Sequence, residues 1–100
     1  MRNVQLTIPR DQIVELCRRY QVRELALFGS SVRDDFGPES DVDLLVEFDP
    51  SAQVGFLTLS RLQRELSAAL NRTVDLVPKR GLKPSIRQSV LDSARVIYAG

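Results

Sequence analysis

The sequence contains no histidine and no tryptophan, one cysteine and only six aromatic residues in 100. Without histidine the chain can form neither a Ser-His-Asp triad nor a zinc site with histidine ligands. The single cysteine, Cys17, excludes an intramolecular disulfide, so we expect a reduced, cytoplasmic setting. No apolar run is long enough to span a membrane, and the first residues do not resemble a signal peptide.

The overall composition is that of an ordinary globular domain, with 43% hydrophobic and 27% charged residues. We expect residues 1–100 to form a single domain with one modest core, as the length suggests. The formal net charge is only +1, so strong nucleic-acid binding is not expected.

The small net charge hides two oppositely charged stretches. Residues 34–50 hold no Lys or Arg and seven acids: Asp34, Asp35, Glu39, Asp41, Asp43, Glu47 and Asp49. From residue 78 onward one acid, Asp92, stands against five bases: Lys79, Arg80, Lys83, Arg87 and Arg95. Two solvated faces are the plain interpretation, and a cation site beside an anion site is the sharper one. We expect four of these basic side chains to be solvated, with an acidic partner or a triphosphate as the alternative: Lys79, Arg80, Lys83 and Arg87.

The spacing of apolar residues and the positions of Gly and Pro predict alternating helices and strands. We expect helices over residues 9–20, 30–36, 56–70 and 84–94, and strands over 23–28, 41–48, 73–77 and 96–98. A turn is expected at 37–38, and the expected core includes Phe28, Phe48, Leu62, Leu66 and Tyr98. This order predicts an α/β (α+β) fold with a small mixed sheet of three or four strands and helices packed on it.

Three carboxylates stand out within this pattern. Asp41 and Asp43 are two residues apart in a strand, so their side chains point to the same face. Asp75 lies between apolar residues of a later strand and can join the pair if the two strands are neighbours. Three oxygen ligands without nitrogen or sulfur favour Mg²⁺ or Mn²⁺ over zinc. Glu47 falls on the same face, where we expect it to serve as a polar surface residue.

A candidate phosphate-binding segment precedes these carboxylates. Gly29 ends a strand and allows close approach of a ligand to the backbone. Ser30 would begin a helix, whose free N–H groups attract phosphate, and Arg33 could reach the same anion. A phosphate site beside a carboxylate metal site is the arrangement for metal-assisted nucleotidyl transfer.

Other phosphate and metal motifs do not match. A calcium-binding EF-hand loop would need Asp or Asn at position 45 and Gly at 46, where the chain has Leu45 and Val46. A P-loop would need Gly-Lys-Ser/Thr five residues after Gly29, where the chain has Asp-Asp-Phe.

Gly29-Ser30, the Asp41-Val42-Asp43 segment and Asp75 at these spacings resemble the minimal nucleotidyltransferases (MNT) of the DNA polymerase beta-like superfamily. The resemblance covers nearly the whole chain and implies the polymerase beta-like palm fold. One residue departs from the family pattern: Asp34 stands where the family usually has Gly after Arg33.

The resemblance also implies roles for the residues of the motif. Asp41 and Asp43 would hold two Mg²⁺ ions bound to ATP, and Asp75 would share a metal and help deprotonate the acceptor. Gly29, Ser30 and Arg33 would hold the β- and γ-phosphates.

MNT proteins look like antitoxins of HEPN-domain RNase toxins, and some transfer AMP to a tyrosine of the toxin. We therefore expect AMP transfer to a HEPN toxin in a hetero-oligomer. A domain of this size leaves little chain to hold the base and the acceptor, so we expect weak nucleotide selectivity without a partner. Two alternatives remain open: an antitoxin with a vestigial active site that acts by direct binding, and an enzyme that modifies a small molecule.

Overall fold

The computed structural model describes residues 8–29 and 41–100. These residues form three α-helices, which are α1 (Arg10–Arg19), α2 (Phe56–Leu70) and α3 (Pro84–Ser93). The strands are β1 (Val22–Phe28), β2 (Val42–Phe48), β3 (Val74–Pro78) and β4 (Arg95–Ala99), and the short 3₁₀ helix η2 (Lys79–Gly81) follows β3. Among these residues, no helix has the length and apolar character needed to cross a membrane.

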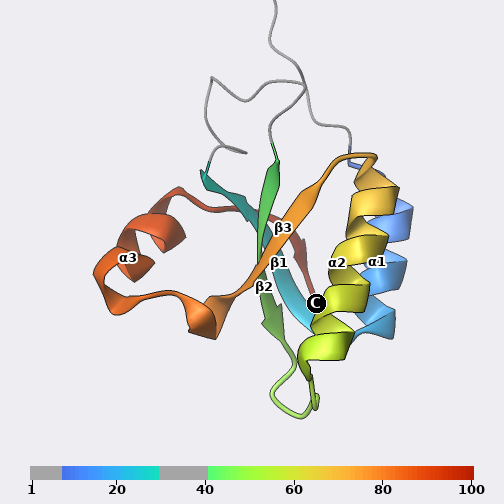
Figure 1. Cartoon of the computed structure of the whole chain (residues 1–100), viewed down its shortest axis with the longest axis horizontal. Helices are drawn as coiled ribbons and strands as arrows, with labels where there is room; N and C mark the ends of the chain where they lie inside the picture. Colours follow the sequence, from blue (N-terminus) through green and yellow to red (C-terminus); the bar gives the residue numbers. More distant parts are fainter. Residues whose placement is uncertain (1–7, 30–40) are drawn as a thin grey trace, which may run out of the picture.

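The four strands form one mixed sheet in the order β3-β2-β1-β4 (Figure 1). β1 pairs antiparallel with both β2 and β4, whereas β2 and β3 pair in parallel. Parallel neighbours need a crossover connection, which α2 supplies between β2 and β3. This connection brings the starts of β2 and β3 to the same end of the sheet.

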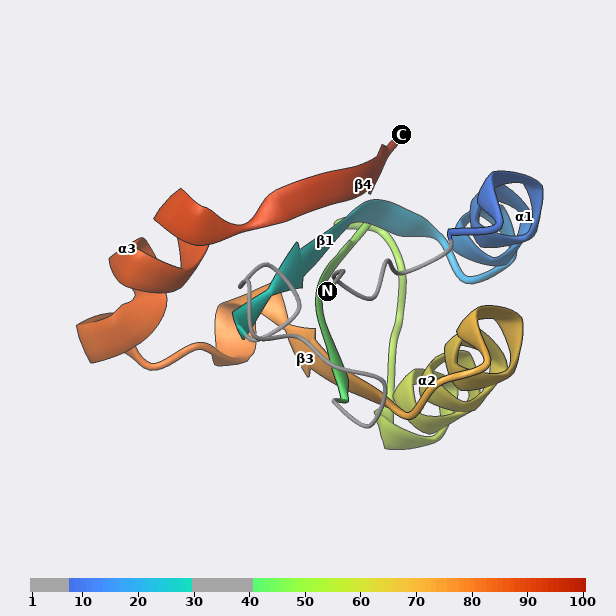
Figure 2. The same ribbon diagram turned by 90° about the horizontal axis from the view of Figure 1, so that it is seen from above.

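The main core lies between one face of the sheet and the pair α1 and α2, which lie side by side in both views (Figures 1 and 2). Helix α2 buries Leu62, Leu66 and Leu70, which recur every four residues along one side of the helix. The strands contribute their alternate apolar residues to this core, such as Val42 and Leu44 of β2. Asn71, in the left-handed conformation with φ 54°, ends α2 and turns the chain into β3.

The opposite face of the sheet is covered only in part. A smaller cluster of Ala26, Leu45 and Leu82 packs there against half-buried residues of α3, and no residue of α3 is itself buried. Figure 2 shows α3 displaced to one end of the sheet, away from α1 and α2. The polar side chains of this second face are therefore accessible at the starts of β2 and β3.

The helices and strands expected from the sequence are confirmed wherever the structure describes them. Helix α2 has the expected bounds, and the other elements differ by one or two residues at their ends. Leu62 and Leu66 are fully buried, whereas Phe28, Phe48 and Tyr98 are half-buried at the borders of the core. The helix expected over 30–36 and the turn at 37–38 lie outside the described residues.

Candidate active site on the second face of the sheet

The pairing of β2 with β3 places two of the three expected carboxylates next to each other. Asp43 and Asp75 are direct partners in the parallel register, and such strands lie about 4.8 Å apart. Their neighbours Val42 and Val74 are buried against α2, so alternation directs both Asp side chains to the second face. Asp41, two residues before Asp43, precedes the strand and is exposed. The condition set by the sequence, that the two strands be neighbours, is met.

Gly29 lies against the carboxylate of Asp43. Phe28, the last residue of β1, is the antiparallel partner of Asp43, so the chain leaves β1 beside that carboxylate. Gly29 has φ +62°, and a Cβ atom built there would be 2.6 Å from Asp43 Oδ2. Both the backbone conformation and the space next to Asp43 therefore require glycine.

The other expected phosphate ligands, Ser30 and Arg33, lie outside the described residues, and their role stays a prediction. Over residues 8–29 and 41–100, no three His, Cys, Asp or Glu side chains converge into a metal cluster. The oxygen-only donors on this face, with Asp43 and Asp75 in register, nonetheless suit a hard divalent cation such as Mg²⁺. The residues present thus fit the expected metal ligands, and Mg²⁺ binding stays a prediction.

A second charged group lies at the other end of the same face. Glu24 of β1 and Glu47 of β2 are cross-strand partners, and Lys79 Nζ lies 3.2 Å from Glu24 Oε1 and 3.4 Å from Glu47 Oε1. The hydrogen bond to Glu24, together with the charges of both carboxylates, raises the pKa of Lys79 above its ordinary value. The expectation that Lys79 is solvated was wrong, because the register places it between two carboxylates. No local signal in the sequence pairs Glu24 with Glu47.

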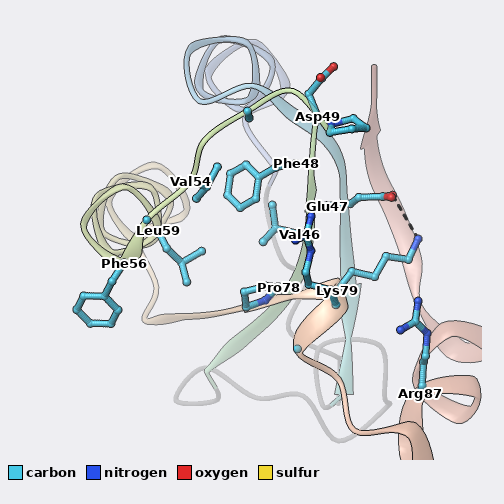
Figure 3. A pocket seen from close by; sticks show the side chains of 15 residues that line it. Val46, Glu47, Phe48, Asp49, Val54, Phe56, Leu59, Pro78, Lys79 and Arg87 are labelled. Carbon is cyan, nitrogen blue, oxygen red and sulfur yellow. Dashed lines mark hydrogen bonds and ion pairs between the residues drawn. The ribbon is translucent and has the colours of Figure 1, made fainter.

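The cavity at the far end of β2 is separate from the three expected catalytic aspartates, and Glu47 and Lys79 lie in its lining. It has a volume of about 510 Å³ and lies between the end of β2, the start of α2 and η2 (Figure 3). Its lining includes Phe48, Pro78 and Arg87 but none of the three expected catalytic aspartates. No sequence pattern indicates this cavity, because its walls come from segments that are distant in the chain, namely residues 46–59, 78–81 and 87.

Comparison with known proteins identifies the family. Residues 10–97 match the family model described as the nucleotidyltransferase domain. The chain is 43% identical over 84 residues to the protein adenylyltransferase MntA of Thermococcus cleftensis, covering 84% of this chain and 81% of the relative. A solved minimal nucleotidyltransferase is 36% identical, with a TM-score of 0.70 and 85% of each chain covered.

A more distant structure shares the fold. This structure is a complex of a tri-AMPylated HEPN toxin of Shewanella oneidensis with an MNT antitoxin. The matched chain has a TM-score of 0.65 at 22% identity. The match covers 91% of this chain and 70% of the solved chain. The family model and the sequence relatives confirm the resemblance inferred from the motif. This chain belongs to the nucleotidyltransferase domain family, among the minimal nucleotidyltransferases, and is a nucleotidyltransferase.

Proposed function

We propose that this chain transfers AMP from ATP to a hydroxyl group of a partner protein, in a Mg²⁺-dependent reaction, and thereby acts as the antitoxin of a HEPN toxin. The single observation that carries this proposal is the register of Asp43 with Asp75, beside Gly29. It gathers acidic oxygens and an open backbone segment at one end of an accessible sheet face.

Each of these residues has a distinct part in the proposed reaction. Asp41 and Asp43 would bind Mg²⁺, which when bound neutralises charge on the triphosphate and favours departure of pyrophosphate. Asp75 accepts the proton of the attacking hydroxyl, which has a pKa near 10 if the acceptor is a tyrosine. The acceptor oxygen then bonds to the α-phosphorus as the bond to pyrophosphate breaks. Gly29 leaves room for the phosphates, with Ser30 and Arg33 as further ligands.

The names of the related proteins support the choice of acceptor. The relative from Thermococcus cleftensis is a protein adenylyltransferase, and the solved antitoxin complex contains an AMPylated HEPN toxin. A tyrosine of a HEPN toxin is thus the acceptor we propose, with the two proteins in a hetero-oligomer. As a single domain over residues 1–100, the chain would depend on this partner to complete the acceptor site.

Intact-mass spectrometry of the partner tests the proposal. The protein encoded beside this chain is tested as the proposed HEPN partner: it is incubated with the chain, ATP and Mg²⁺, and the same mixture with EDTA tests the metal requirement. We expect the partner to gain mass in steps of one AMP unit, and to gain none with Asp41→Asn/Asp43→Asn. Asp11→Asn on α1, which removes an exposed acid on the opposite side of the sheet, serves as the matched control.

Two results would contradict the enzymatic proposal. Unchanged partner mass together with a stable complex for both variants would support an antitoxin that acts by binding alone. A mass gain that persists in Asp41→Asn/Asp43→Asn would exclude this pair as the catalytic carboxylates.

A further inference from the structure

The cavity at the end of β2 has an apolar interior of a size suited to a large side chain. Val54 and Leu59 lie opposite Phe48 and Val46 of β2, and Pro78 lies beside Val46 as its partner on β3 (Figure 3). Its volume of about 510 Å³ lies within the range of about 300–1,000 Å³ typical of binding pockets. These side chains come from the sheet, the β2–α2 connection and α2, so the folded core holds the cavity open.

The charged side chains around the cavity differ in what they already bind. Glu47 is paired with Lys79, and Asp49 accepts hydrogen bonds from the backbone N–H and the hydroxyl of Ser51. Arg80 and Arg87 are exposed and form no ion pair with any other described residue. The rim thus offers two unengaged guanidinium groups, which bind carboxylates well.

Apolar surface continues from the cavity onto the start of α2. Phe56 is 80% exposed and Leu57 is 73% exposed, and Phe56 projects outward beyond the cavity (Figure 3). Leu57 does not line the cavity, so a small ligand that filled the cavity would leave this side chain in water. A partner surface would cover the cavity and these residues together, and exposed aromatic residues of this kind mark protein interfaces.

Both edges of the sheet are poorly suited to bind such a partner by strand addition. On β3, the N–H groups of Val74 and Leu76 donate to Ser67 Oγ and Gln63 Oε1 of α2. On β4, the register shifts at Ile97, which leaves a bulge in a five-residue strand. Bulges and covered edges disfavour pairing with another strand. The partner must therefore bind through side chains.

We propose that the cavity, Phe56, Leu57 and the two arginines form the docking surface for an acidic segment of the partner protein. An apolar side chain of this segment enters the cavity beside Phe48, and its carboxylates pair with Arg80 and Arg87. The identification of that partner as a HEPN toxin rests on the proposed function. Asp43 is five residues before Phe48 in β2, or about 16 Å along the strand. Docking and AMP transfer therefore use different residues and can be tested separately.

The test uses biolayer interferometry to measure the affinity of the chain for the protein encoded beside it, taken as the proposed HEPN partner. We expect Phe56→Asp and Arg80→Glu/Arg87→Glu each to raise Kd by about tenfold or more. Phe56→Leu, which keeps an apolar side chain, should stay within about threefold of the wild type. Arg18→Glu, at an exposed arginine of α1 outside the cavity lining, is the charge control and should leave Kd unchanged.

Folding and catalysis are controlled in the same series. Phe56 is mostly exposed, so Phe56→Asp should unfold at the wild-type temperature, as followed by circular dichroism. Asp41→Asn/Asp43→Asn should bind with wild-type Kd while it transfers no AMP. Weakened binding by Phe56→Asp without any AMP transfer by the wild type would uphold the docking surface and refute the proposed enzyme.

Three results would overturn the inference. One is wild-type Kd for both docking variants while AMP transfer proceeds. Another is that Arg80→Glu/Arg87→Glu weakens binding of a fluorescent ATP analogue but not of the partner, which would make the cavity a nucleotide site. The third is no binding of the partner by the wild-type chain, which would refute the antitoxin proposal as well.

Discussion

Gly29→Ala should lower both the stability of the chain and its rate of AMP transfer. The added Cβ would lie 2.6 Å from Asp43 Oδ2, whereas ordinary contacts begin at 3.4 Å, so the carboxylate must retreat by about 0.8 Å. Alanine at φ +62° also costs about 1–2 kcal/mol in backbone strain. A displacement of this size at a catalytic group can lower a rate by about 100-fold. We therefore expect a loss of about 1–2 kcal/mol in the free energy of unfolding and about 100-fold in AMP transfer.

Urea denaturation followed by circular dichroism gives the stability, and the initial rate of AMP incorporation into the partner gives the activity. Gly81→Ala is the matched control, because no atom lies within 4 Å of a Cβ built at Gly81. It should not lower the free energy of unfolding, because alanine at this position meets neither a clash nor a left-handed backbone. Wild-type transfer by Gly29→Ala would show that the position of Asp43 beside Gly29 does not matter, and would refute the reasoning.

Three further predictions concern the rest of the fold. Leu62→Ala, at a fully buried position of α2, should lower the free energy of unfolding by about 2–5 kcal/mol in urea denaturation. Lys79→Met should lower the free energy of unfolding by about 1 kcal/mol, because it leaves the like charges of Glu24 and Glu47 opposed across β1 and β2. Adding Glu24→Gln should restore most of that loss. Burial raises the pKa of the Cys17 thiol from 9.0 to about 12, so above about pH 9 the unfolded chain loses the thiol proton first and stability falls with rising pH. Cys17→Ala should flatten that decline between about pH 9 and about pH 12, as measured from urea midpoints, and equal slopes for both proteins would contradict this account.

Local patterns in the sequence predict the helices and strands of the described residues, and they also predict the candidate metal ligands Asp41, Asp43 and Asp75. Helix α2 could be predicted to the residue, because its leucines recur with the helical period and Gly55 and Asn71 flank it. The shared face of Asp41 and Asp43 follows from the period of a strand. These features depend on neighbours within a few residues, which the sequence displays directly.

Contacts between residues that are distant in the chain depend on the tertiary packing. The parallel pairing that joins Asp43 to Asp75 depends on how α2 packs its leucines against the sheet. The same packing sets the position of Lys79 between two glutamates and encloses the cavity around Phe48. Strand register between segments about 30 residues apart is fixed by burial of one face of the sheet, and no local pattern encodes it.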